Sequence, residues 1–145
     1  PMSADWLPLD DIAGAGALLS DLSWIEGTRA AFEVARAHAV PAVVDLDMGS
    51  GRLLTDVAHL TDYVIASAPA LDAFINGNTI EEKLRTLVAS GARHAGVTRG
   101  AGGYTWMDCD GAVHHQPAFH VNVRDTTGAG DAFHGAFCWA LLNGH

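Results

Sequence analysis

The sequence predicts an α/β fold, in which a mostly parallel sheet carries helices on both of its faces. Short apolar runs typical of buried strands alternate with longer segments of helical period. Strands separated by helical segments need crossover connections, and these favour a parallel sheet covered on both sides. The chain has 145 residues, 49% of them hydrophobic and 17% charged. This length and composition suit a single folded domain.

The first half of the chain contains three predicted strands and one predicted helix. The apolar run 17–22 suits a buried strand, and residues 26–38 follow it with the broad apolar face of a helix. Segment 41–46 begins with proline and continues with β-branched residues, which indicates a second strand. Residues 62–66 have the composition of a third strand.

The clearest helix in the sequence spans residues 79–90. Thr79 is suited to cap its first turn, because Glu82 lies three residues further on, as in a capping box. Gly91 follows the last turn, where glycine commonly ends a helix. This segment therefore carries both a start signal and a stop signal.

The last part of the chain returns to strands before it ends in a helix. Residues 94–98 form a predicted fourth strand, and 102–108 and 112–116 are two short strands that bracket an Asp-Gly turn. A glycine-rich turn at 127–130 then precedes a helical run that extends to Leu142. Ligands of such sheets usually bind beyond the carboxyl ends of the strands.

The charge balance and the apolar runs exclude several classes of protein. Eight Lys and Arg against 17 Asp and Glu give a net charge of −9, and no basic cluster is present, so we expect no binding to nucleic acid. No apolar run has the length of about 20 residues that a membrane span needs. Cys109 and Cys138 lack CxxC spacing and indicate reduced thiols. We therefore expect a cytoplasmic protein without membrane contact.

The segment with the strongest chemical signal is the nine-residue string DTTGAGDAF at 125–133. Gly128 and Gly130 permit close approach of the backbone, and the helix that starts there directs unpaired N–H groups at whatever lies before it. Asp131 places a carboxylate beside this anion site. Amides that stabilise a phosphoryl group and a carboxylate that accepts a hydroxyl proton suit phosphoryl transfer. Without the rest of the string, Asp131 would be interpreted as an ordinary residue at the start of a helix, where Asp is common.

This string and the GAF that follows at 135–137 resemble the C-terminal signature of the ribokinase-like carbohydrate kinases, the PfkB family. Segments 43–45, 62–67 and 97–103 fall in the family's usual order, and 22–27 is similar to members that act on fructose-like sugars. The resemblance covers essentially the whole chain. It implies that residues 1–145 are the middle-to-C-terminal portion of a ribokinase-like three-layer sandwich, without the N-terminal half and the lid.

The resemblance implies a role for each residue of the glycine string. Asp131 matches the catalytic base that deprotonates a sugar hydroxyl. The amides of Gly128, Ala129 and Gly130, together with that of Asp131, match the anion hole for the γ-phosphate. Asp125 and Thr127 match positions that help to hold a monovalent cation, K⁺, in many members.

A second matched segment lies at the predicted nucleotide site. Thr98 and the glycines after it, Gly100, Gly102 and Gly103, match the loop that lines this site in the family. From the residues alone, the glycine string reads more simply as a hairpin-like turn. Ser67 is suited to replace the family's Asn or Ser that helps to organise magnesium, but the usual Glu does not follow, and Asp72 is a poor substitute.

Two functions of different class remain open at this point. The first is ATP-dependent phosphorylation of a sugar hydroxyl, with ATP and a small sugar as substrates, Mg²⁺ as cofactor and a fructose-like acceptor as one candidate. The second is a truncated and catalytically inert scaffold that binds nucleotide or serves as an interaction fragment. We expect little or no turnover from the isolated 145 residues. The resemblance is also compatible with a homodimer, because related kinases often pair through their lid strands.

Overall fold

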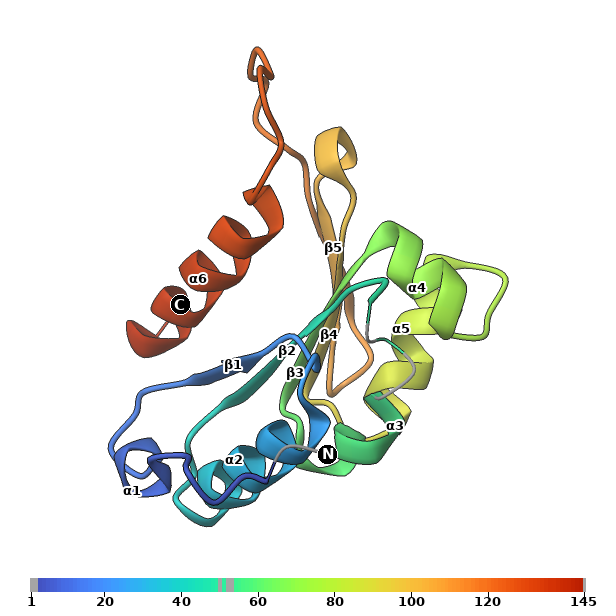
Figure 1. Cartoon of the computed structure of the whole chain (residues 1–145). Helices are drawn as coiled ribbons and strands as arrows, with labels where there is room; N and C mark the ends of the chain where they lie inside the picture. Colours follow the sequence, from blue (N-terminus) through green and yellow to red (C-terminus); the bar gives the residue numbers. More distant parts are fainter. Residues whose placement is uncertain (1–2, 50, 52–53, 145) are drawn as a thin grey trace.

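The computed structural model describes residues 3–49, 51 and 54–144, so the ends of the predicted unit 1–145 lie outside the described residues. A six-stranded sheet forms its centre, with the strands in sequence order (Figure 1). The strands are β1 (Leu18–Ser20), β2 (Ala42–Leu46), β3 (Tyr63–Ser67), β4 (His94–Thr98), β5 (Tyr104–Asp108) and β6 (Val113–Gln116). Strands β1 to β4 are parallel, and β5 and β6 continue the sheet antiparallel.

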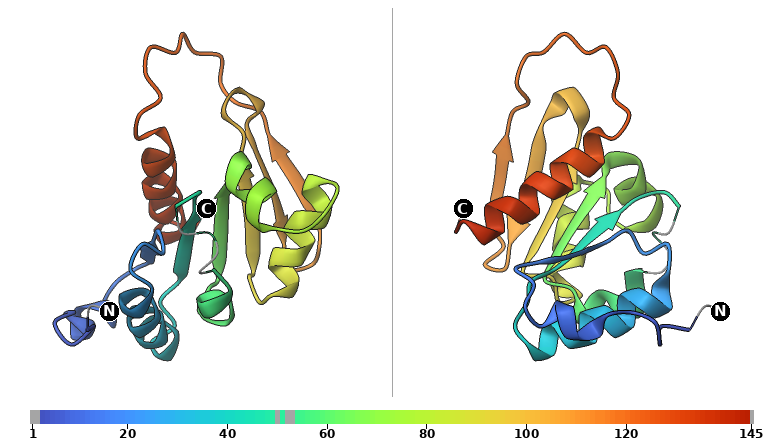
Figure 2. Two further views of the ribbon diagram at one scale, coloured as in Figure 1. Left: turned by 45° about the vertical axis from the view of Figure 1, so that its right-hand side comes forward. Right: turned by 60° about the vertical axis from the view of Figure 1, so that its left-hand side comes forward.

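Helices lie on both faces of this sheet, as predicted. Figure 1 shows α6 on one side of β1 and α2 on the other, and Figure 2 shows α4 and α5 on the opposite side of the sheet from α6. The helices are α1 (Leu9–Ile12), α2 (Ile25–Ala37), α3 (Leu54–Val57), α4 (Ala68–Phe74), α5 (Ile80–Ala89) and α6 (Ala129–Leu142), with short 3₁₀ turns η2 (Ala58–Leu60) and η3 (Gly100–Gly102). The incomplete three-layer α/β arrangement is therefore confirmed.

The core lies between the sheet and helices α2 to α5. Alternate residues of each strand point to opposite faces, so Val64 belongs to this core while its neighbour Ile65 is buried on the face of α6. Phe32 of α2 and Leu84 of α5 are completely buried in the core cluster. On the other face, the Phe137 ring of α6 packs edge-on at 5.6 Å from the ring of Tyr63.

The predicted elements match the observed ones to within a few residues, and the differences have local causes. The strand expected at 17–22 ends at Ser20, because Leu22 adopts a φ of +66° that turns the chain toward α2. Helix α5 begins as expected, with the Thr79 side chain accepting the Glu82 N–H at 3.2 Å. The short helices α1, α3 and α4 escaped the sequence patterns because they span too few turns to show a period.

No helix among the described residues is long and apolar enough to cross a membrane. The longest one, α6, has 14 residues.

A half-buried pair of rings joins β4 and β5 on the face of α6. His94 Nε2 and the Tyr104 hydroxyl lie 2.7 Å apart, and the His94 ring is within 5.3 Å of the Phe137 ring. Burial lowers the pKa of His94 to about 4, an effect that His114 reinforces and Asp108 opposes. Burial also raises the pKa of Tyr104. Both groups are therefore neutral at pH 7, and the tautomer of the imidazole decides which of them donates this hydrogen bond.

We expect the folded protein to lose stability in weak acid because of His94. An unfolded chain protonates this histidine near pH 6.5, whereas the folded protein does so only near pH 4. The unfolded state therefore binds more protons in this window, and unfolding becomes easier by up to about 3 kcal/mol as the pH falls through it. Urea unfolding at several pH values should show this slope, and His94→Asn should flatten it. An unchanged slope in the variant would contradict the assignment.

Candidate functional site

Polar side chains gather at the carboxyl ends of the parallel strands, next to the start of α6. A cavity of about 270 Å³ opens there. Its lining combines the ends of β2, β3 and β4 with the first turns of α6, namely Asp45, Asp47, Ser67, Thr98, Gly128, Gly130, Asp131 and His134. The sheet edge and the glycine turn, which lie far apart in the sequence, thus form one site, as the parallel topology predicts.

Asp131 also lines a second and larger cavity, of about 490 Å³, on the side of β1 and α2. Trp24 forms one wall, with its ring over Gly27, where any side chain would collide with it, and stacked at 5.0 Å on Trp6. Asp45 and His134 line this cavity as well as the smaller one. The exposed carboxylate of Asp131 therefore stands where the two cavities meet.

The turn between β1 and α2 places polar groups in the larger cavity. Asp21 accepts the backbone N–H and the hydroxyl of Ser23 at 2.9 and 2.8 Å, and these bonds lower the pKa of the Asp21 carboxyl. Ser20 Oγ lies 2.6 Å from the hydroxyl of Thr28. The positive φ of Leu22 permits this tight arrangement. The sequence analysis pointed to segment 22–27 but did not single out Ser20, Asp21 and Thr28, because these residues come together only through the turn.

The glycine turn begins α6 in the conformation that an anion site requires. Gly128 has a φ of +72° at the N-cap position, where the helix has no side-chain cap. The amide of Ala129 donates to Thr126 O at 3.1 Å and is thus engaged within the turn. Among the described residues, no hydrogen bond is recorded for the amides of Gly128, Gly130 and Asp131. These three are the amides that an anion can approach.

The residues predicted to hold a monovalent cation lie in the exposed connection that precedes α6. Figure 2 shows this connection reaching beyond the sheet between β6 and α6. Asp125 accepts the backbone N–H of Thr127 at 2.9 Å, and hydrogen bonds from Thr127 lower the pKa of the Asp125 carboxyl. The carboxylate is therefore ionised and orients the glycine turn. Its role toward K⁺ stays a prediction.

The second predicted loop forms a tight turn between two antiparallel strands, as the residues alone indicated. Thr98 ends β4 and lines the smaller cavity. Gly100, Gly102 and Gly103 lie in the turn that leads into β5, where Arg99 N–H donates to Gly103 O at 2.9 Å. None of these three glycines lines either cavity beside Asp131. Their contact with nucleotide stays a prediction.

Ser67 has a carboxylate beside it, but this carboxylate comes from another strand. The Ser67 hydroxyl donates to Asp47 Oδ1 at 3.0 Å, and its oxygen caps α4 by accepting the Ala70 N–H at 3.3 Å. Asp72, the only nearby acid in the sequence after Ser67, instead pairs with Lys83 at 2.5 Å. The sequence analysis missed Asp47, although an Asp-x-Asp pair across the end of a predicted strand is a signal that could have found it.

Within the described residues, no group of three or more His, Cys, Asp or Glu side chains is arranged to hold a metal ion. The chain therefore offers no magnesium cage of its own in this part. Mg²⁺ commonly keeps several water ligands and binds through substrate phosphates in kinases, so phosphates rather than this chain would supply most of its ligands.

The family assignment follows from comparison with known proteins. The profile of the pfkB family carbohydrate kinases matches residues 9–145. The chain belongs to the pfkB family of carbohydrate kinases. Deoxyribokinase of Salmonella typhi is 36% identical over 115 residues, which are 74% of this chain and 36% of that protein. The chain thus spans little more than a third of this curated relative.

Solved structures of pfkB-type kinases share this fold. A ribokinase candidate from Agrobacterium tumefaciens is 33% identical with a TM-score of 0.85, over 95% of this chain and 46% of that one. A ribokinase II candidate from Escherichia coli, solved in complex with ATP and Mg²⁺, is 20% identical with a TM-score of 0.79. That match covers 97% of this chain and 49% of the other. The chain therefore corresponds to about half of these structures.

We expect Gly103 to be required for the stability of this pfkB-type fold. Gly103 has a φ of +82°, and an added Cβ would meet the backbone oxygen of Gln116 at 2.1 Å. Gly103→Ala should therefore cost about 3–4 kcal/mol in free energy of unfolding. Gly100→Ala is the matched control, because Gly100 also has a positive φ but open space around it, and should cost about 1–2 kcal/mol. Urea denaturation measures both, and equal losses would contradict the close approach.

Proposed function

We propose that this pfkB family protein catalyses ATP-dependent phosphorylation of a sugar hydroxyl, with Asp131 as the general base. The observation that carries the proposal is the position of Asp131, at the meeting point of two cavities and in the first turn of α6. A carboxylate between an acceptor site and an anion site is the arrangement that phosphoryl transfer to a hydroxyl needs. The names of the relatives support a sugar as the acceptor.

The two cavities would divide the reaction between them. The larger cavity offers Asp21 and Ser23 to sugar hydroxyls, with Trp24 as part of its apolar wall. The smaller cavity, with the amides of Gly128 and Gly130 at its rim, would receive the γ-phosphate of ATP. The sugar would thus approach from the side of β1, and the nucleotide from the side of β4 and its loop. Ribose, deoxyribose and fructose-like sugars are the acceptors to screen.

In the proposed reaction, Asp131 accepts the proton of the attacking hydroxyl. The oxygen forms a bond to the γ-phosphorus while the bond from that phosphorus to the β–γ bridging oxygen breaks, and ADP leaves with this oxygen. The amides at the start of α6 stabilise the negative charge of the transferred group. Mg²⁺ would arrive with ATP and neutralise phosphate charge.

We expect Asp131→Asn to lower kcat by at least about a hundredfold, because the amide cannot accept the proton. The KM for ATP should change little, since the backbone amides remain. The assay is ATP-dependent phosphorylation of the screened sugars by the protein, with any sequence that flanks this chain in its source. Asp110→Asn is the matched control, because Asp110 lies in the exposed turn between β5 and β6.

Each outcome of this assay decides between the two classes of function. Retained kcat in Asp131→Asn would show that Asp131 is not the base. Absence of turnover in the unaltered protein, with ATP binding intact, would favour an inert nucleotide-binding scaffold. Turnover that requires the flanking sequence would agree with the low activity expected of the isolated 145 residues.

We also propose that K⁺ binds beside the anion site through Asp125 and Thr127. A cation there would stabilise the turn that leads into α6 and favour the approach of phosphate. Activity should therefore be higher in K⁺ than in a bulky organic cation at equal ionic strength, and Asp125→Ala should remove the difference. Equal rates in both salts would contradict the cation role while leaving that of Asp131 intact.

A further inference from the structure

A third cavity lies at the amino ends of the parallel strands, at the opposite end of the sheet from Asp131. Its volume is about 330 Å³, and it is formed by the end of α2, by η2 and by the residues at the starts of β2, β3 and β4. No step of the proposed reaction uses this cavity. The titratable and charged side chains that line it are those of Arg36, His59, Asp62, Tyr63 and Arg93.

The charge of this cavity differs from that of the two cavities beside Asp131. Arg36 and Arg93 line it together with one carboxylate, that of Asp62. Among the described residues, no Lys or Arg lines either cavity beside Asp131, where Asp45 also faces the space. The whole chain has eight Lys and Arg and a net charge of −9. Two guanidinium groups in one cavity therefore make a local positive site in an acidic protein.

The guanidinium of Arg36 is held at this cavity by the backbone. Arg36 lies in the last turn of α2, and its Nη1 donates to the backbone oxygen of His59 in η2. A guanidinium carries five N–H donors in a planar fork, so this bond leaves most of them unused. The group is thus fixed in place while it keeps donors for an oxyanion.

Arg93 reaches the same cavity from the residue before β4. Its backbone N–H donates to Asp62 O at 2.7 Å, which holds this part of the chain beside β3. In the part of the chain that the structure describes, no hydrogen bond or ion pair is recorded for its guanidinium. The Asp62 carboxylate is engaged elsewhere, because its Oδ2 accepts the N–H of Ala42 at 3.0 Å. The donors of Arg93 are therefore available to a ligand.

We propose that the cavity between Arg36 and Arg93 binds a phosphate group, at a site separate from that of the proposed reaction. Guanidinium groups match the geometry of phosphate oxygens, with which they form paired, charge-assisted hydrogen bonds. The volume lies within the range of about 300–1,000 Å³ that is typical of sites for small molecules. The cavity therefore has room for inorganic phosphate or for a small phosphorylated metabolite.

This site and the anion site at α6 lie at opposite ends of the same strands. Strands β2, β3 and β4 have five residues each. A strand rises about 3.3 Å per residue, so about 15 Å separates their two ends. An anion at one end therefore leaves the other end free, and binding at the third cavity does not depend on the proposed kinase function.

The test is a titration of the ¹⁵N-labelled protein with inorganic phosphate, followed by the NMR signals of its backbone amides. The protein carries any sequence that flanks this chain in its source, and sodium chloride keeps the ionic strength constant. We expect saturable shifts at His59, Asp62 and Arg93, whereas the amides of Gly130 and Asp131 report on the α6 site separately. Absence of saturable shifts at the first three residues, or equal shifts with chloride alone, would overturn the proposal.

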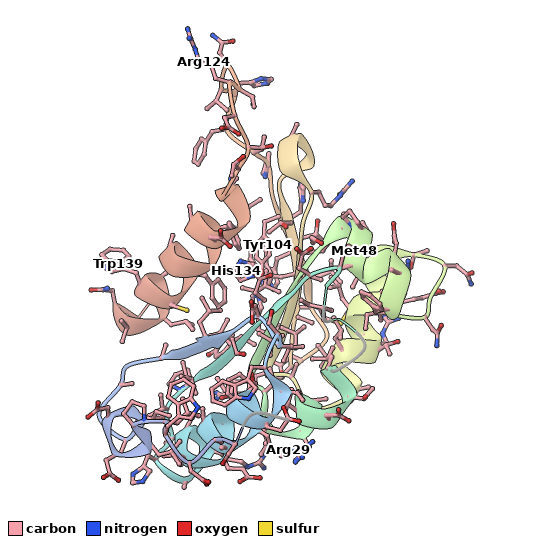
Figure 3. All side chains as sticks on the ribbon, viewed as in Figure 1. Arg29, Met48, Tyr104, Arg124, His134 and Trp139 are labelled. Carbon is pink, nitrogen blue, oxygen red and sulfur yellow. The ribbon has the colours of Figure 1, made fainter. Side chains whose placement is uncertain are left out.

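Two variants assign the binding to the arginines. Arg36→Gln and Arg93→Gln should each weaken phosphate binding about tenfold or more, because each removes charge-assisted bonds. Arg93→Gln should fold normally, since its guanidinium has no recorded partner to lose. The matched control is Arg29→Gln, which should leave the affinity unchanged. Figure 3 shows Arg29 on α2, on the opposite side of the sheet from His134 of α6, and Arg29 does not line the cavity.

The outcomes of these titrations decide both the site and its ligand. Unchanged affinity in Arg36→Gln or Arg93→Gln, or an equal loss in Arg29→Gln, would contradict the site. Ribose 5-phosphate that shifts the same amides and binds more tightly than inorganic phosphate would support the site and identify a phosphorylated metabolite as its ligand. Equal or weaker binding would support the site with the free ion as its ligand. None of these measurements needs turnover, so they stand whether or not the protein phosphorylates a sugar.

Discussion

The arrangement of this molecule depends on one geometrical constraint, that four parallel strands end at the same edge of the sheet. Residues at the ends of β1, β2 and β3, or directly after them, therefore meet in space, although a helix or a long turn separates each from the next. Asp21, Asp47 and Ser67 reach the site in this way. The hydrogen bond from Ser67 to Asp47 closes between neighbouring strands because their carboxyl ends are adjacent. The parallel topology of the sheet, and not a single sequence motif, brings these side chains together.

Helix α6 supplies the other half of the site, and its attachment to the sheet is uneven. Ring contacts of Phe133 and Phe137 hold its inner side, whereas the Trp139 side chain is 62% exposed. His134 is the one buried residue of α6, and its side chain contacts β2 and β3. A helix held by apolar contacts can rotate or slide by small amounts, because such contacts have little directionality. Directional bonds at its first turn would restrict this freedom where the chemistry needs it.

Charge sets the second requirement of the site. The whole chain carries a net charge of −9, and Asp45, Asp47 and Asp131 line the same small cavity. A phosphate would be repelled from such a cavity unless local dipoles attract it. The backbone amides at the start of α6 supply such dipoles, because they attract anions without a cationic side chain. The positive φ of Gly128 makes these amides accessible. This conformation explains physically why glycine stands at the start of α6.

The sequence by itself determined the order of the strands and the three longer helices, the cap at Thr79, and the nine-residue string that begins α6, because each depends on neighbours within a few positions. It also determined the family, since the string is specific. Only the tertiary structure decided that Asp45 meets His134 and that Asp47, not Asp72, stands beside Ser67. These pairs join segments that are distant in the chain, and no local pattern encodes which of several aspartates a folded sheet brings to a given serine or histidine.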